Sequence, residues 1–160
     1  MGTFEAFFSE QKGALLRALY VMTGSRDEAA DICQDAFLAV WERWDRVGSL
    51  DDPTGYLFRT AMNRHRSHLR RARVATRRLL DRTTVRDQLS DAVDRADVAR
   101  ALQQLSGRRR EAIVLTELLQ FDSEHAATIM GVASSTVRRL AQDARADLER
   151  LLEAGHEPTR

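Results

Sequence analysis

Five polar residues within eight positions near the C-terminus have side chains suited to binding nucleic acid. Helical spacing places all of them on the outward side of one helix: Ser135, Thr136, Arg138, Arg139 and Gln142. Apolar residues such as Val137 and Leu140 form the opposite, inward stripe. Hydroxyl and guanidinium groups bind phosphate oxygens, and arginine and glutamine also hydrogen-bond base edges in the major groove. The pattern therefore predicts a helix that reads duplex DNA.

The segment before this helix supplies a shorter helix and a tight turn. Asp122 can cap a helix over 123–130, and Gly131 stands where a left-handed residue would end it. Ser134 can cap the helix that follows. With a small residue, Ala127, where the two helices would cross, this spacing is typical of a helix-turn-helix. A plain helical hairpin inside an all-α core is the alternative that the same spacing leaves open.

Charge is concentrated on two other helical segments. Residues 64–86 contain nine arginines and one acidic residue, Asp81, a net charge of +8 in a chain whose total is +1, so the remainder carries −7. An acidic row, Asp27, Asp31 and Asp35, steps by four along an earlier helix. Such polarity indicates one surface for a polyanion and another for a basic partner. The alternative is a solvated helix end with a basic linker.

The remaining polar residues do not form a catalytic or metal-binding motif. His65 and His68 stand three apart, but arginines flank them and no carboxylate or thiol joins them. The sequence has no glycine-rich phosphate loop and no nucleophile paired with a base. We therefore expect a protein that is not an enzyme and that uses no metal or cofactor. The single cysteine, Cys33, excludes an internal disulfide.

Helical periodicity runs through most of the chain and predicts an all-α fold. Of the 160 residues 43% are hydrophobic and 31% are charged, and only two are prolines, which is ordinary for a helical globular protein. No apolar run approaches the roughly 20 residues that span a bilayer. The N-terminal segment is acidic where a secretory signal would be basic. We expect a cytoplasmic protein with no membrane insertion.

Breaks in the periodicity divide the chain into two small helical domains. Gly24 stops a first helix and Ser25 can cap a second, whose apolar face extends to Trp44. A third helix follows the turn around Pro53 and continues into the arginine cluster. The spans that we expect are a first domain over 1–73, a linker over 74–95, a helix-turn-helix domain over 96–152 and a tail over 153–160.

Three blocks in this order carry a resemblance to a known family. The blocks are "DEAADICQDAFLAVWERWDR", "PTGYLFRTAMNRHRSHLRR" and "LSGRRREAIVLTELLQFDSEHAATIMGVASSTVRRLAQDAR". They resemble the acidic helix, the promoter-opening helix and the fourth-region signature of the extracytoplasmic-function (ECF) sigma factors, bacterial transcription initiation factors of the sigma-70 family. The resemblance covers nearly the full length of the chain.

The resemblance implies partners and residues for each domain. The first domain would bind the clamp helices of the β′ subunit of core RNA polymerase and melt the -10 promoter element, and the last would lie near the β flap and read the -35 element. The implied polymerase contacts are Asp31, Gln34, Asp35, Leu38 and Trp41. The implied -10 contacts are Arg59, Asn63, Arg66, Arg70 and Arg71. A separate anti-sigma factor is a further partner that the resemblance admits.

Five positions depart from the family pattern. In the recognition helix, Arg139 takes the usual position of a serine and Leu140 replaces an arginine. Ser67 stands where Asp or Asn is usual, and His125 fills a usually acidic position at which we expect a surface residue. Asp143 replaces a basic residue of the recognition helix; it repels phosphate but can accept a hydrogen bond from a cytosine amino group, so we expect a changed promoter preference. Two other functions remain open, a stand-alone helix-turn-helix regulator with an N-terminal dimerisation domain and a decoy that sequesters an anti-sigma factor.

Overall fold

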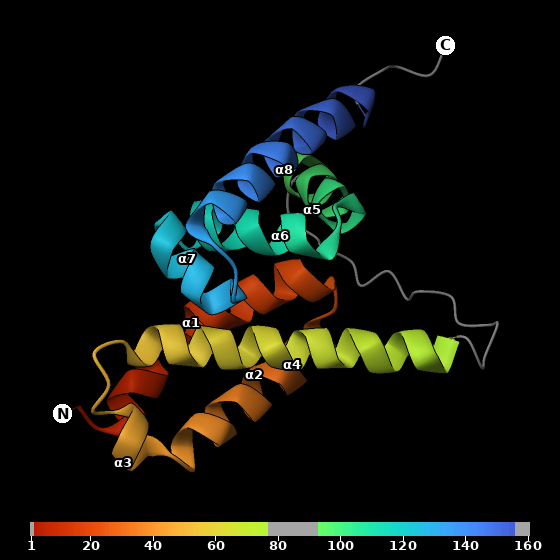
Figure 1. Cartoon of the computed structure of the whole chain (residues 1–160). Helices are drawn as coiled ribbons and strands as arrows, with labels where there is room; N and C mark the ends of the chain where they lie inside the picture. Colours follow the sequence, from red (N-terminus) through yellow and green to blue (C-terminus); the bar gives the residue numbers. More distant parts are fainter. Residues whose placement is uncertain (1, 77–92, 156–160) are drawn as a thin grey trace.

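The structure, a computed structural model, describes residues 2–76 and 93–155, and every regular element within these ranges is a helix. The all-α fold expected from the sequence is thus confirmed. The N-terminal domain contains α1 (Phe4–Thr23), α2 (Arg26–Trp41), α3 (Trp44–Val47) and α4 (Pro53–Thr76). The C-terminal domain contains α5 (Val93–Gln104), α6 (Gly107–Ile113), its π-helical continuation η1 (Val114–Leu118), α7 (Ser123–Met130) and α8 (Ser134–Gly155). Figure 1 shows the two groups of helices stacked on each other.

Local signals set the boundary between α1 and α2 as predicted. Gly24 ends α1 in the left-handed conformation, with φ 71°, and its N–H donates to the carbonyl of Tyr20 at 2.8 Å. The hydroxyl of Ser25 then accepts from the backbone N–H of Glu28 at 3.2 Å, which caps α2. The predicted stop and the predicted cap are both confirmed.

The end of α2 differs from the prediction. The helix stops at Trp41, and Trp44, which we expected on its apolar face, instead begins the short helix α3. The break lets the Trp44 ring pack against α1, with centroids 5.5 Å from Phe4 and 5.0 Å from Phe7. Aromatic packing against another helix therefore ends α2, although no glycine or proline stands between the two tryptophans.

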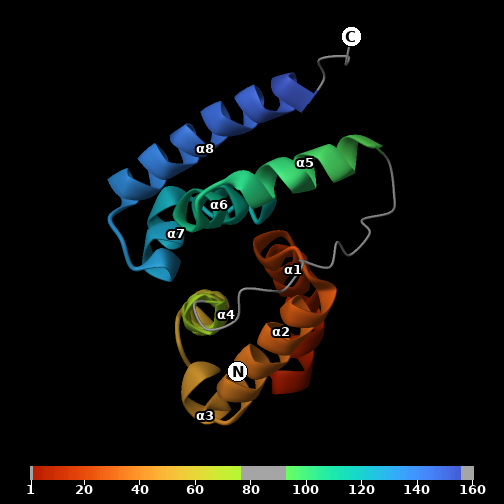
Figure 2. The ribbon, with the colours of Figure 1, turned by 90° about the vertical axis from the view of Figure 1, so that its right-hand side faces the viewer.

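The two domains share one core. α4 packs against α7, and α1 packs against α5, α6 and η1. Figure 2, which looks along α4, shows this helix between α2 on one side and α7 on the other. One buried cluster runs from Leu15 and Leu57 in the N-terminal domain to Leu115 and Val137 in the C-terminal domain. A smaller cluster joins α5 to α6 and α8.

The linker expected over 74–95 lies mainly outside the described residues. Residues 74–76 belong to α4 and residues 93–95 belong to α5. Among the helices that the structure describes, none combines the length and the apolar character needed to cross a bilayer.

Candidate nucleic-acid interface

The helix-turn-helix is formed by α7, a tight turn and α8. A carboxylate oxygen of Asp122 accepts from the N–H of His125 at 2.7 Å and caps α7. Gly131 adopts φ 69° and donates its N–H to the carbonyl of Ala127 at 2.8 Å. Ala127 is buried where the helices meet, and Val137 is fully buried. The predicted cap, turn and crossing residue are confirmed.

One boundary of the motif was predicted wrongly. Ser134 is the first residue of α8 rather than its cap. The carbonyl of Ala133 accepts from the N–H groups of Thr136 and Val137 at 3.0 and 3.1 Å, so the helical hydrogen bonds start one residue earlier than expected. Shifts of this size are common at helix ends, and the outward side of the helix is unchanged.

The residues predicted to read duplex DNA lie together on α8. Ser135, Arg138, Arg139 and Gln142 are exposed, and Thr136 is half-buried. A shallow groove beside them is lined by Thr116, Phe121, Ser123, Val137, Arg138, Ala141, Gln142 and Arg145. Within this groove, Nη1 of Arg138 donates to the hydroxyl of Ser123 at 3.0 Å, which holds the guanidinium at the N-terminal end of α7.

A second groove lies on α4. It is lined by Arg43, Tyr56, Arg59, Thr60, Asn63, Arg64 and Ser67. Arg59 and Asn63, both predicted to contact DNA, are exposed there. Two lining residues were not predicted from the sequence, Arg43 and Tyr56; the hydroxyl of Tyr56 accepts from Nη1 of Arg43 at 3.4 Å. Tyr56 stands seven residues, two helical turns, before Asn63, and this spacing could have placed both on one face.

The other arginines predicted to contact the -10 element lie outside this groove and do not share one surface. Arg70 and Arg71 are exposed further along α4, beyond the groove. Arg66 is drawn toward the other domain instead. Its Nη1 donates to the side-chain oxygen of Asn63 at 3.1 Å, and its Nη2 donates to Glu111 of α6 at 2.7 Å.

The residues predicted to contact polymerase lie on one side of α2. Asp31 and Gln34 are exposed, and Asp35 is half-buried with a carboxylate oxygen 3.9 Å from Nη1 of Arg64. Two large apolar side chains on this side are unusually exposed to solvent, Leu38 at 50% and Trp41 at 58%. An exposed apolar pair beside acidic residues is typical of a protein-binding surface.

Comparisons with known proteins identify the family. A family model for sigma-70 region 2 matches residues 7–75, and one for sigma-70 region 4 matches residues 95–148. The RNA polymerase sigma-E factor of Streptomyces avermitilis is 30% identical over 155 residues, which cover 94% of this chain and 86% of that protein. The ECF RNA polymerase sigma factor SigL of Mycobacterium tuberculosis is 29% identical over 142 residues, which cover 83% of this chain and 79% of SigL. The chain belongs to the ECF sigma factors of the sigma-70 family.

Solved structures of sigma factors have the same fold. RpoE of Bartonella quintana, in complex with the anti-sigma factor NepR, matches with a TM-score of 0.79 and 26% identity over 94% of this chain and 96% of that chain. CnrH, in complex with the cytosolic domain of CnrY, matches with a TM-score of 0.69 and 28% identity over 94% and 88%. The present chain is thus a sigma factor that binds core RNA polymerase and directs transcription initiation at specific promoters.

Two buried ionisable groups of the sigma factor lie near the boundary between its domains. Glu111 and His65 are each 3% exposed. Burial raises the pKa of Glu111, while its partners Arg66 and Arg108 lower it. Burial, followed by the positive charge of Arg110, lowers the pKa of His65 from 6.5 to about 4. An uncharged imidazole is therefore held among arginines at neutral pH.

A second interdomain contact of the sigma factor involves a residue expected on the surface. His125 lies 2.6 Å, from Nε2 to Oδ2, from Asp52 of the N-terminal domain. The other oxygen of Asp52 accepts from the N–H of Gly55 at 2.8 Å and caps α4. The Phe121 ring lies 4.5 Å from the His125 ring and 5.4 Å from that of Phe58. His125 keeps 29% of its side chain exposed, so it lies at the surface but also joins the two domains, a contact that sequence spacing does not show.

Arg110 joins the ends of two helices from different domains of the sigma factor. Its guanidinium donates to the carbonyls of Leu102 and Gln103, near the end of α5, at 2.7 Å each. It also donates to the carbonyl of Met22, near the end of α1, at 2.9 Å. The side chain of Gln103 adds a bond to the carbonyl of Val21 at 2.7 Å. A cation at two helix C-termini satisfies carbonyls that lack helical partners.

Proposed function

We propose that three surfaces divide the work of initiation between α8, α4 and α2. The observation that carries the proposal is the exposure of two separate basic surfaces, one on each domain, together with an acidic and apolar surface on α2. DNA attracts the basic surfaces through its phosphates, and polymerase is the partner for the third. The protein acts by binding, without catalytic residues of its own, in the cytoplasm where polymerase works.

The recognition helix α8 reads the -35 element in the major groove. Arg138, Arg139 and Gln142 are the residues for base edges, because arginine pairs with guanine and glutamine with adenine through two hydrogen bonds. Ser135 and Thr136 lie in the first turn of α8, where hydroxyl and backbone N–H groups can bind a phosphate.

The groove on α4 receives an unstacked base of the -10 element. Tyr56 offers a stacking surface and Asn63 offers an amide for the base edge. Arg59 and Arg64, which line the same groove, supply positive charge for the backbone of the single strand. Arg70 and Arg71 extend this charge along α4 toward the adjacent DNA.

The exposed side of α2 binds the clamp helices of the β′ subunit. Trp41 and Leu38 are the apolar centre of this surface, since aromatic side chains dominate the energetics of protein interfaces. Asp31 and Asp35 form its acidic rim and favour a basic partner. The C-terminal domain lies near the β flap when the promoter is bound.

Promoter binding requires the two domains to separate. Elements centred 25 base pairs apart lie about 85 Å from each other along B-DNA. The 22 residues of α8 extend only about 33 Å, and α4 lies directly against α7, next to α8. Separation also releases Arg66 from Glu111, which makes this arginine available to the -10 strand.

An anti-sigma factor acts on this packed form. RpoE of Bartonella quintana was solved with its anti-sigma factor NepR, and the match to this chain extends over both domains with a TM-score of 0.79. A partner that binds the packed form better than the form with separated domains shifts the population toward the packed form. The anti-sigma factor would thereby keep the polymerase-binding and DNA-binding surfaces from working together.

Abortive transcription from a genomic promoter library, with bacterial core polymerase and with or without the purified chain, tests the proposal. We expect chain-dependent initiation at promoters that share two elements. Binding to duplex DNA without binding to polymerase would support the stand-alone regulator instead. Tight binding to polymerase without any initiation would support the decoy.

A further inference from the structure

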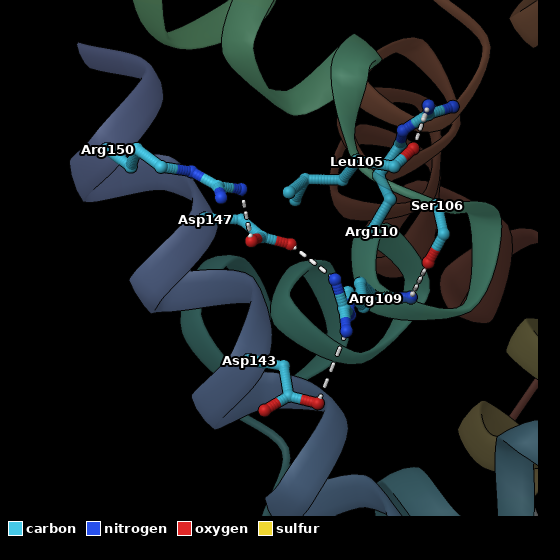
Figure 3. A network of polar contacts seen from close by, with 7 residues as sticks. All are labelled: Leu105, Ser106, Arg109, Arg110, Asp143, Asp147 and Arg150. Carbon is cyan, nitrogen blue, oxygen red and sulfur yellow. Dashed lines mark hydrogen bonds and ion pairs between the residues drawn. The ribbon is translucent and has the colours of Figure 1, made fainter. Parts of the chain in front are cut away.

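An arginine outside the recognition helix holds two of its acidic residues. Arg109 lies in the first turn of α6, where Ser106 caps its N–H. Its Nη1 lies 2.6 Å from a carboxylate oxygen of Asp147, and its Nη2 lies 3.5 Å from one of Asp143. Arg150 contacts the other oxygen of Asp147 at 2.7 Å. Figure 3 shows Arg109 between the two carboxylates, both of which project from α8 toward α6.

Asp143 stands at the edge of the surface that faces DNA. It follows Gln142 directly and lies four residues after Arg139, so Asp143 and Arg139 are neighbours along one side of the helix. Its side chain is 44% exposed. An unrestrained carboxylate at this position would repel phosphates and would also attract the guanidinium of Arg139.

The side chain of Arg139 is free to contact DNA. It makes no hydrogen bond or ion pair with any residue in the ranges that the structure describes, and it is exposed. One oxygen of the nearest carboxylate along the helix, that of Asp143, lies 3.5 Å from Nη2 of Arg109. Arg139 is thus available to DNA while the carboxylate of Asp143 faces Arg109.

We propose that Arg109 is a positioning residue for -35 recognition, which holds the carboxylate of Asp143 against α6 and away from both the phosphates and Arg139. The proposal rests on the role of α8 given above. It is an alternative to the expectation that Asp143 reads a cytosine, because one oxygen of the Asp143 carboxylate already lies 3.5 Å from Nη2 of Arg109. Arg109 acts through Asp143 and need not touch DNA.

A set of single and double variants tests this role. The full-length chain is bound to core polymerase, and the affinity for a promoter fragment selected from the genomic library is measured over a range of salt concentrations. Arg109→Gln should weaken binding about tenfold, the loss expected for one charged contact. Arg109→Gln combined with Asp143→Asn should restore affinity to within about twofold, because the repelling carboxylate is gone.

The matched control is Arg150→Gln. It removes the same charge from the same network and breaks the pair with Asp147, but it does not contact Asp143. We expect its affinity to equal that of the wild type. Arg109→Lys, which keeps the charge, should retain most of the binding. Thermal unfolding of each variant separates a loss of stability from the loss of DNA affinity.

Each alternative gives a different result. If Arg109 contacts phosphate directly, Asp143→Asn will fail to rescue Arg109→Gln, and the positioning role is wrong. If Asp143 reads a base, Asp143→Asn alone will change the preference at one base pair, which also overturns the proposal. Arg139→Ala tests the underlying role of α8: if it binds the promoter as tightly as the wild type, the proposed recognition surface fails as well.

Discussion

Arg66 and Glu111 connect the two DNA-binding domains through a hydrogen bond of 2.7 Å, and the Glu111 side chain is 3% exposed. Arg66 is the only one of the arginines predicted to contact the -10 element that pairs, within the described ranges, with a carboxylate of the other domain. A buried charged hydrogen bond of this kind contributes about 2 kcal/mol. The packed form is therefore stabilised by a side chain that promoter binding would use.

Replacing the buried acid should loosen the packed form. Glu111→Gln keeps the size of the side chain but removes its charge, so we expect the equilibrium to shift toward separated domains by about 2 kcal/mol, roughly thirtyfold. Small-angle X-ray scattering should report a larger radius of gyration. Glu117→Gln is the matched control, because Glu117 pairs with Arg145 inside the C-terminal domain. An unchanged radius in both variants would contradict the role of the interdomain pair.

His65 should make stability fall in mild acid. Its pKa in the folded protein is about 4, below the ordinary 6.5, so the unfolded chain takes up a proton first as the pH falls. The contribution of His65 to the free energy of unfolding is fully present above pH 6.5. It declines by about 1.4 kcal/mol per pH unit down to about pH 4. Urea unfolding from pH 7.5 to 4.5 should show a shallower decline for His65→Leu. His68→Leu, one turn further along α4, removes only one of the smaller causes that lower the pKa of His65, so it should reduce the decline far less than His65→Leu does.

Substitutions of the two tryptophans near the end of α2 should affect different properties, polymerase binding for Trp41 and stability for Trp44. Trp41 is 58% exposed, so Trp41→Ala should weaken binding to core polymerase by about 2 kcal/mol while the melting temperature stays unchanged. Trp44 packs on Phe4 and Phe7, so Trp44→Ala should destabilise the fold by about 2 kcal/mol. Polymerase affinity by fluorescence titration, together with thermal unfolding, measures both. A Trp41 variant that melts early but binds normally would reverse the assignment.

Arg138 should carry specificity at one base pair. Arg138→Ala should cost about 1 to 3 kcal/mol on the preferred promoter if the guanidinium pairs with a guanine. On a promoter in which that base pair is changed, the variant and the wild type should bind with equal affinity, because neither can then make the contact with guanine. Arg17→Ala, which removes the same charge from an exposed position on α1, controls for net charge. An equal loss on every promoter sequence would reassign Arg138 to phosphate binding.

Local chemistry made much of the fold predictable. Gly24, Ser25, Asp122 and Gly131 act within three or four residues of themselves, and all four have the expected conformation or hydrogen bond. The exposed rows on α2 and α8 follow from helical spacing alone. Ser134 shows the limit of such signals, since a serine before a helix can equally begin it.

The contacts between the domains could not be predicted in this way. Arg66 and Glu111 are 45 residues apart, and Asp52 and His125 are 73 apart. No local pattern selects these partners, because they meet only when the two domains pack against each other. The same reason applies to Asp143, whose neighbour Arg109 comes from a separate helix.

The core shared by the two domains also affects how long an unused molecule survives. Phe58, 1% exposed, packs on Phe121 of the other domain, and separation would expose both rings to water. An open molecule that has not met polymerase would present this apolar surface to proteases and to aggregation. We expect cellular turnover to remove mainly the open, unbound form, so the amount of free polymerase would set the lifetime of the sigma factor as well as its activity.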